Sequence, residues 1–179
     1  MKPNIHLLID RSPELPYFIL AVLYLFSTSA PGSAHIFAMA FLFVLVSLAV
    51  GLALKSFFKT KRPIKHYNLP ALRYDFPSLH SMISIGIIVF VYYFNPAYSL
   101  VLIPVGLFYL YSRLKLKAHS IEGVVGGVVL GLILGFLFGR FSTLFYLPEV
   151  VEMALAIILF CTPLLTAVFR MKYSERIDF

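Results

Sequence analysis

Three polar sequences interrupt an otherwise apolar chain: KSFFKTKRP at residues 55–63, PSLH at 77–80 and SRLKLKAHSIE at 112–122. Each of them lies at the end of an apolar run. Lys, Arg and His side chains brought to the same depth by separate helices suit a phosphate group, because fixed positive charge and N–H donors bind its oxygens. The region 55–122 therefore predicts a polar site formed where several helices end.

The composition is that of a membrane protein. Of 179 residues, 60% are hydrophobic and 13% are charged, and the mean hydropathy is +0.91, well above the range of soluble domains. Lys and Arg number 15 against 8 acidic residues, which suits anionic lipid head groups or a phosphorylated substrate. Nucleic acid is excluded as a partner because the sequence contains no soluble domain to present a basic face. The single cysteine, Cys161, cannot form an internal disulfide.

The apolar runs predict an all-α, polytopic membrane helix bundle with about six transmembrane helices, in a single domain over residues 1–179. The expected spans are 16–30, 34–58, 79–94, 97–112, 119–139 and 148–169. Residues 1–15 are too few and too charged to cross a bilayer, so they are expected to lie on its surface. A proline-rich polar loop is expected over 59–77.

The fifth expected span has a glycine at every fourth position, namely Gly123, Gly127, Gly131, Gly135 and Gly139. This spacing places the glycines on one face, where another helix backbone is able to come close. Packing inside the bundle is favoured over dimerisation, because a six-helix protein has interior partners. The pattern leaves the oligomeric state open.

The spans predict that all Lys and Arg residues except Arg140 lie on one side of the membrane. The positive-inside rule makes that side cytoplasmic. A requirement for cations in phosphate binding weakens this inference without reversing it. The expected location is thus a multi-pass integral membrane protein whose basic active-site face is cytoplasmic.

The polar sequences contain the groups needed for phosphoryl transfer. Three cations are available to bind a phosphate group: Lys55, Arg62 and Arg113. Ser78 precedes a span, where its hydroxyl is placed to cap the helix while the N–H groups of Leu79 and His80 face an anion. The two histidines His80 and His119 allow one imidazole to attack phosphorus and the other to protonate the leaving alcohol.

The order and spacing of these residues are specific: Lys55-x6-Arg62-Pro63, Pro77-Ser78-Leu79-His80 and Ser112-Arg113-x5-His119. With this three-part signature, concentrated in residues 55–127, the chain resembles the type 2 phosphatidic acid phosphatase family, which is related to vanadium haloperoxidases. The resemblance implies that Lys55, Arg62, Ser78 and Arg113 hold the phosphate, and Leu79 is expected to add its backbone N–H. It implies that His119 forms a phosphohistidine and that His80 acts as general acid and then helps water attack. The family uses no metal or organic cofactor.

The chain departs from the family pattern at two positions. The family usually has Gly where Leu79 stands, and an Asp that orients the imidazole where Gly123 stands. Glu122 is expected to take over that orienting role, because i+3 and i+4 lie on neighbouring parts of one helix face and Glu is longer than Asp. The alternative is that Glu122 is a charge at head-group level. Asp75 is interpreted as a partner of a cation such as Arg62 or as a solvated loop carboxylate.

The expected function is therefore that of a membrane lipid phosphate phosphatase, which hydrolyses a lipid phosphomonoester or diphosphate through a phosphohistidine. Candidate substrates are phosphatidylglycerol phosphate, phosphatidic acid and polyprenyl phosphate or diphosphate, so phosphorylated lipid and membrane lipid are the expected partners. Two alternatives remain open: a lipid phosphotransferase, and a catalytically silent relative that binds or transports phospholipid.

Overall fold

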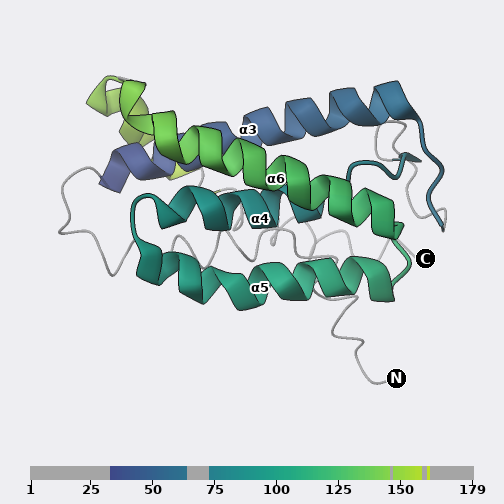
Figure 1. Cartoon of the computed structure of the whole chain (residues 1–179). Coiled ribbons are helices and arrows are strands. Elements are labelled where there is room, and N and C mark those ends of the chain that lie inside the picture. Colours follow the sequence, from purple (N-terminus) through teal and green to yellow (C-terminus); the bar gives the residue numbers. More distant parts are fainter. Residues whose placement is uncertain (1–32, 64–72, 146, 159–160, 162–179) are drawn as a thin grey trace, which may run out of the picture.

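We describe residues 33–63, 73–145, 147–158 and 161 of a computed structural model (Figure 1). The α-helices are α3 (Ser33–Phe58), α4 (Leu79–Tyr92), α5 (Pro96–Lys115) and α6 (Ile121–Phe141), followed by the short 3₁₀ helix η2 (Ser142–Leu144). Residues 149–158 are also helical. The expected all-α architecture is confirmed for the described part of the chain.

Polar residues define where three of the helices begin. Ser78 caps α4 and accepts from the Ser81 N–H, Asn95 caps α5, and Ser120 caps α6 and accepts from the Gly123 N–H. These side chains satisfy backbone donors that have no partner within the helix. As a result α6 begins two residues later than its hydropathy suggests, and His119 lies just outside the helix.

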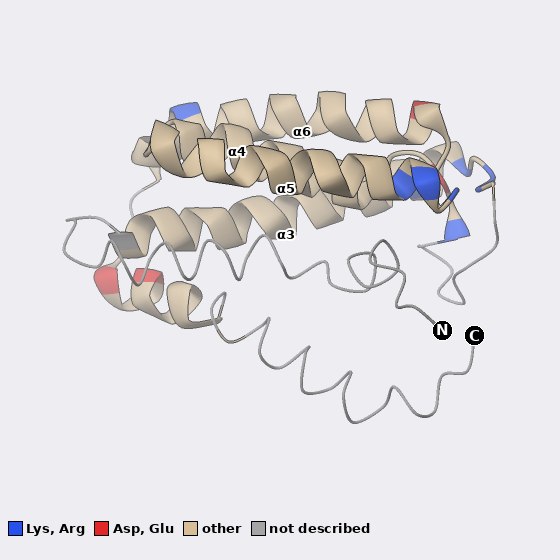
Figure 2. Ribbon diagram, turned by 90° about the horizontal axis from the view of Figure 1, so that it is seen from below, with Lys and Arg blue, Asp and Glu red and all other residues tan. Residues whose placement is uncertain are grey.

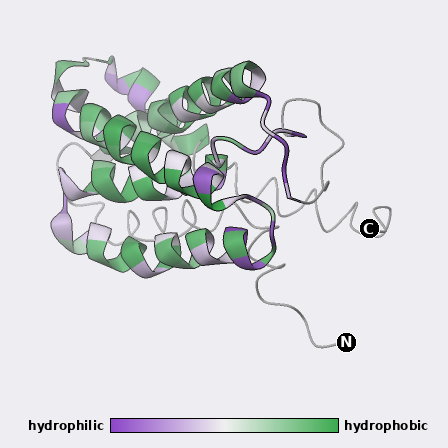
Figure 3. Ribbon diagram, turned by 45° about the vertical axis from the view of Figure 1, so that its right-hand side comes forward, coloured by the Kyte–Doolittle hydropathy of each residue, from purple (hydrophilic) through white to green (hydrophobic). Residues whose placement is uncertain are grey.

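Three of the described helices are long and apolar enough to cross a membrane: Ala34–Phe58, Pro96–Lys115 and Ile121–Leu144. The helix α4 is apolar but has only 14 residues. The six expected crossings are not shown, because 1–15 and 16–30 lie outside the described residues and 148–169 is described only in part. The flanks of the helices are hydrophobic (Figure 3), with exposed apolar side chains that include Leu100, Leu107, Val129, Ile133 and Phe136.

The closest packing in the bundle is between α4 and α6, at the glycine face predicted from the sequence. A Cβ atom at Gly131 would run into the Met82 carbonyl oxygen, and one at Gly135 would run into the Gly86 carbonyl oxygen. Only helices without side chains at these positions can bring their backbones so close. The interpretation that the glycines serve packing within the bundle is confirmed.

The hydrophobic core lies where α3 and α5 pack against α4, which is the central helix in Figure 1. It includes Met39, Phe43, Ile87, Phe90 and Leu102, all buried. The Phe43 ring stacks on Phe90, with centroids 6.1 Å apart, and meets the edge of Phe138 from α6. This core fixes the helices relative to one another and therefore fixes the ends that carry the polar residues.

Charged residues lie at the two ends of the bundle (Figure 2). The end formed by the last turns of α3 and α5 and the first turns of α4 and α6 is basic, with Lys55, Arg113 and Lys115 in those last turns. Arg140 lies in the last turn of α6, at the other end. The predicted segregation of cations therefore holds for the described residues, and its orientation across a membrane stays a prediction.

Candidate active site

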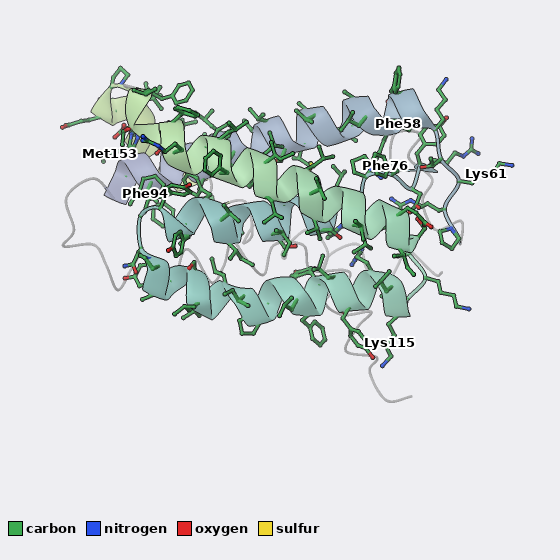
Figure 4. The ribbon with its side chains drawn as sticks, viewed as in Figure 1. Phe58, Lys61, Phe76, Phe94, Lys115 and Met153 are labelled. Carbon is green, nitrogen blue, oxygen red and sulfur yellow. The ribbon has the colours of Figure 1, made fainter. Side chains whose placement is uncertain are left out.

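The candidate site lies at the basic end of the bundle. Hydrogen bonds join its segments: the Ser78 N–H donates to the Gly123 carbonyl oxygen at 2.9 Å, which ties the start of α4 to α6. The loop before α4 is held by an edge contact between the Phe58 and Phe76 rings, with centroids 5.1 Å apart (Figure 4). Residues that are far apart in the sequence are thereby fixed around one location.

His119 is buried, with 3% of its surface exposed, and its ring is held by a carboxylate. The Nδ1 atom of His119 lies 2.7 Å from Oδ1 of Asp75. Burial acts to raise the pKa of Asp75, but hydrogen bonds from His119 and Ser120 outweigh this effect and hold the pKa below its ordinary value. Asp75 is therefore ionised at neutral pH and can only accept hydrogen bonds, so the proton lies on Nδ1 of His119 and Nε2 carries a lone pair.

Lys55 and Arg62 support the loop that carries Asp75. The fully buried Lys55 donates from Nζ to the carbonyl oxygens of Tyr74 at 2.7 Å and Asp75 at 2.9 Å. Arg62 donates from Nε to the Tyr74 carbonyl oxygen at 3.0 Å, and from a terminal nitrogen to the Ala118 carbonyl oxygen at 3.2 Å. Both cations were predicted to bind phosphate, and the structure adds these backbone contacts.

Glu122 does not take the position that the sequence suggested. The Glu122 side chain is exposed, and the carboxylate against Nδ1 of His119 belongs to Asp75. The physical reason is the cap at Ser120: because α6 begins at Ile121, His119 is not part of the helix, and the i+3 relation to Glu122 does not apply. Asp75 makes the contact with the His119 ring that was expected from Glu122. The sequence pattern did not predict this contact.

The remaining predicted residues lie at the start of α4 and the end of α5. Ser78 and Arg113 are completely buried, and Leu79 is 8% exposed. His80 is partly exposed, and its ring stacks on that of Tyr109, with centroids 6.2 Å apart. Tyr109 lies one turn before Arg113 on α5, so this stacking brings His80 to the same end of α5 as Arg113.

Arg113 also connects to His119 through the backbone. The carbonyl oxygen of Arg113 accepts from the N–H groups of Ala118 at 3.0 Å and His119 at 3.4 Å, which folds the link between α5 and α6 back toward the end of α5. Within the described residues, no three His, Cys, Asp or Glu side chains form a group suited to a metal ion. Hydrogen bonds thus join His119, Asp75, Lys55 and Arg62 through the loop before α4. His80 and Arg113 lie at the same end of the bundle, in the first turn of α4 and the last turn of α5.

This arrangement defines an all-helical protein with membrane-type helices and a polar site with the groups for phosphate chemistry at one end. A model of the PAP2 superfamily matches residues 36–147, over half of the chain. The chain belongs to the PAP2 superfamily, as its three motifs predicted. Because members are generally phosphatases, membership suggests phosphatase activity on phosphate monoesters. No curated protein and no solved structure matches the chain.

Proposed function

We propose that this protein is a membrane phosphatase that removes phosphate from a lipid phosphomonoester or a lipid diphosphate through a phosphohistidine. The observation that carries the proposal is the pairing of buried His119 with Asp75. A neutral imidazole whose Nδ1 proton is held by a carboxylate presents its other nitrogen as a nucleophile.

In the first step, Nε2 of His119 attacks phosphorus, and the bond from phosphorus to the ester oxygen breaks. His80 gives its proton to that oxygen, so the lipid leaves as an alcohol, or as a phosphate when the substrate is a diphosphate. The phosphorylated ring of His119 is then cationic, because Nδ1 keeps its proton. The Asp75 carboxylate stabilises this positive charge at 2.7 Å.

In the second step, water attacks phosphorus while His80, now neutral, accepts a proton from it. The bond between phosphorus and Nε2 breaks, inorganic phosphate leaves, and His119 returns to its neutral form. Each step transfers a phosphoryl group whose charge lies on the non-bridging oxygens, and fixed positive charge stabilises it. The two histidines are thereby ready for another turnover.

The phosphate would be held by Arg113 and by the first N–H groups of α4, at Leu79 and His80, beside the cap Ser78. Lys55 uses two of its three hydrogens on carbonyl oxygens, which leaves one to donate to a phosphate oxygen. Lys55 and Arg62 would therefore bind the phosphate and support the Asp75 loop at the same time.

A lipid substrate is supported by the surroundings of the site. The helices that end there carry exposed apolar side chains along their flanks, including Leu100 and Leu107 on α5 and Val129 on α6 (Figure 3). Acyl or prenyl tails would lie against these flanks while the phosphate reaches the basic end. A catalytically silent relative is disfavoured, because Asp75 supplies the carboxylate that Gly123 lacks.

The test is phosphate release by the purified protein from phosphatidylglycerol phosphate, phosphatidic acid, and polyprenyl phosphate and diphosphate, each with a chelator present. We expect release from at least one lipid, and slower release from a short water-soluble phosphomonoester. Transfer of phosphate to an added lipid alcohol in place of water would identify a phosphotransferase. Binding of all four lipids without release of phosphate would refute the proposal.

The pH dependence of this activity follows from the environment of His119. Burial lowers the pKa of His119 from its ordinary value of 6.5 to about 4, a shift that the Asp75 hydrogen bond opposes and the charges of Arg62 and Lys55 assist. The ring therefore stays neutral and nucleophilic as the pH falls through 6.5, and is protonated only near pH 4. We expect kcat/KM to decrease as the pH is lowered to about 4, where the His119 ring becomes protonated.

The acid side of the pH profile of kcat/KM is measured with two substrates whose phosphate groups ionise at different pH values. A decline in kcat/KM that occurs at the same pH with both substrates comes from a group of the enzyme. A substrate-independent decline centred near pH 6.5 would show that His119 titrates like an exposed histidine, contrary to its burial.

A further inference from the structure

We propose that Asp75 is the positioning residue of His119, and that Gly123 is a glycine because the Asp75 carboxylate occupies the space where a side chain at 123 would begin. The carboxylate that the family usually carries on the helix after the nucleophile is thus carried here by the loop before α4. This inference rests on the proposed function. Positions 75 and 123 are therefore coupled, because the space beside the His119 imidazole holds one carboxylate, which either position can supply.

The first observation is the bonding of the Asp75 carboxylate, of which 3% is exposed. Its Oδ1 atom accepts from Nδ1 of His119 at 2.7 Å, and its Oδ2 atom accepts from the Ser120 hydroxyl. The Ser120 N–H donates to Oδ1 of Asp75, with nitrogen and oxygen 3.2 Å apart, and to Oδ2, at 3.3 Å. A carboxylate held on both oxygens fixes the plane and the tautomer of the ring that it contacts.

The second observation is the space that α6 leaves for the loop. A Cβ atom at Gly123 would lie 2.9 Å from Oδ2 and 3.0 Å from Oδ1 of Asp75. A Cβ atom at Gly126 would run into the Phe76 ring. Gly123 and Gly126 therefore leave space for the side chains of the consecutive residues Asp75 and Phe76. A side chain at position 123 would begin in the space that the Asp75 carboxylate occupies.

The third observation is the support of the Asp75 backbone on both sides. The Asp75 N–H donates to the Thr60 carbonyl oxygen at 2.9 Å, and the Phe76 N–H donates to the Thr60 hydroxyl at 2.8 Å. Lys55 donates to the Asp75 carbonyl oxygen. These three hydrogen bonds hold the backbone on both sides of the Asp75 side chain, which is the support that a carboxylate carried by a loop needs in order to orient an imidazole.

The test exchanges the two positions. We expect Asp75→Gly to lower the rate of phosphate release at least about tenfold, as the loss of a carboxylate that orients a catalytic imidazole does. Gly123→Asp alone is also expected to lower the rate, because two carboxylates cannot share this space. The double variant Asp75→Gly/Gly123→Asp should release phosphate at least about tenfold faster than Asp75→Gly, since it restores one carboxylate.

Two matched variants separate positioning from packing. Asp75→Gly/Gly123→Asn has a side chain of the same size without charge, and we expect no recovery from it. Asp75→Asn keeps the shape of the loop, so its expected loss of rate does not depend on the folding of the double variant. Thermal unfolding of every variant in detergent identifies losses that come from instability. A loss in Glu122→Gln as large as that in Asp75→Asn would overturn the assignment.

Nitrogen NMR of the His119 ring provides a readout that does not require activity. The wild-type ring should carry its proton on Nδ1, Asp75→Gly should mix the tautomers, and the double variant should restore the Nδ1 proton. Independent effects of the two substitutions in an active enzyme would overturn the pairing and leave the phosphatase proposal standing. The expected NMR pattern without phosphate release from any lipid would instead refute the proposed function alone.

Discussion

We expect His119→Gln to lower phosphate release by about 10³-fold or more, because the glutamine amide has no lone pair able to attack phosphorus and no covalent intermediate can form. The loss should appear in kcat for every substrate that the wild-type protein accepts. His119 is buried and bonded to Asp75, so the variant must be shown to fold. The measurement is phosphate release together with thermal unfolding in detergent.

The control for this variant is His35→Gln. His35 is a histidine of α3 at the opposite end of the bundle, where Nδ1 contacts Glu152 at 2.6 Å and Nε2 contacts the Ser142 carbonyl oxygen at 3.1 Å. This replacement also removes the contacts of a partly buried imidazole, but it leaves the candidate site intact. We therefore expect the rate of phosphate release to change by less than about threefold, because substitutions at distant sites act nearly independently.

Trapping of the intermediate adds a second measurement. Wild-type protein quenched in alkali during turnover of a lipid carrying labelled phosphate should retain label, since phosphohistidine is stable in base and labile in acid. His119→Gln should retain none. Label that persists in His119→Gln would place the nucleophile on another residue.

Much of the fold was predictable because each helix carries a continuous apolar run. The expected spans 34–58, 79–94, 97–112 and 119–139 agree with α3 to α6 to within a few residues at each end. The glycine spacing also predicted that a helix backbone would approach α6. It did not name the partner, because local periodicity says which face is small and not which helix meets it.

The part of the site that follows from motifs was also predictable, whereas the contact of Asp75 was not. The three sequence motifs identified His80, Arg113 and His119 as candidate site residues, because the order and spacing of the motifs are specific. The expectation for Glu122 assumed that the helix includes His119, but Ser120 caps the start of α6, so the helix begins only after His119. One signal was present in the sequence: an acid in the loop before Pro77 accompanied by a glycine at 123.

The roles of Lys55 and Arg62 show the same limit. Both are cations of the signature, and a phosphate-binding role follows from charge alone. Their hydrogen bonds to the Tyr74 carbonyl oxygen depend on how the loop folds across the end of α3. Contacts between a side chain and a distant backbone carbonyl leave no trace in residue type, because every residue has the same carbonyl group.

The second large effect is expected for His80→Ala, and it should depend on the leaving group. A lipid alcohol is a poor leaving group that needs a proton, so the variant should lose about 10²–10⁴-fold in the first turnover, the usual contribution of a general acid. A nitrophenyl phosphate expels a stable anion without protonation. Its first turnover in His80→Ala should therefore remain within about tenfold of the wild-type rate, because this step no longer needs the acid.

The second half of the reaction also depends on His80, since water must lose a proton as it attacks the phosphohistidine. With nitrophenyl phosphate, His80→Ala should thus release one burst of nitrophenol per active enzyme and then turn over slowly, with label held on His119. Rapid mixing that resolves the burst is the measurement, and the same variant assayed with the lipid substrate is its own control. Equal losses in the first turnover for both substrates would mean that His80 binds or packs without donating a proton. His80 stacks on Tyr109, so a purely structural role would slow both reactions alike.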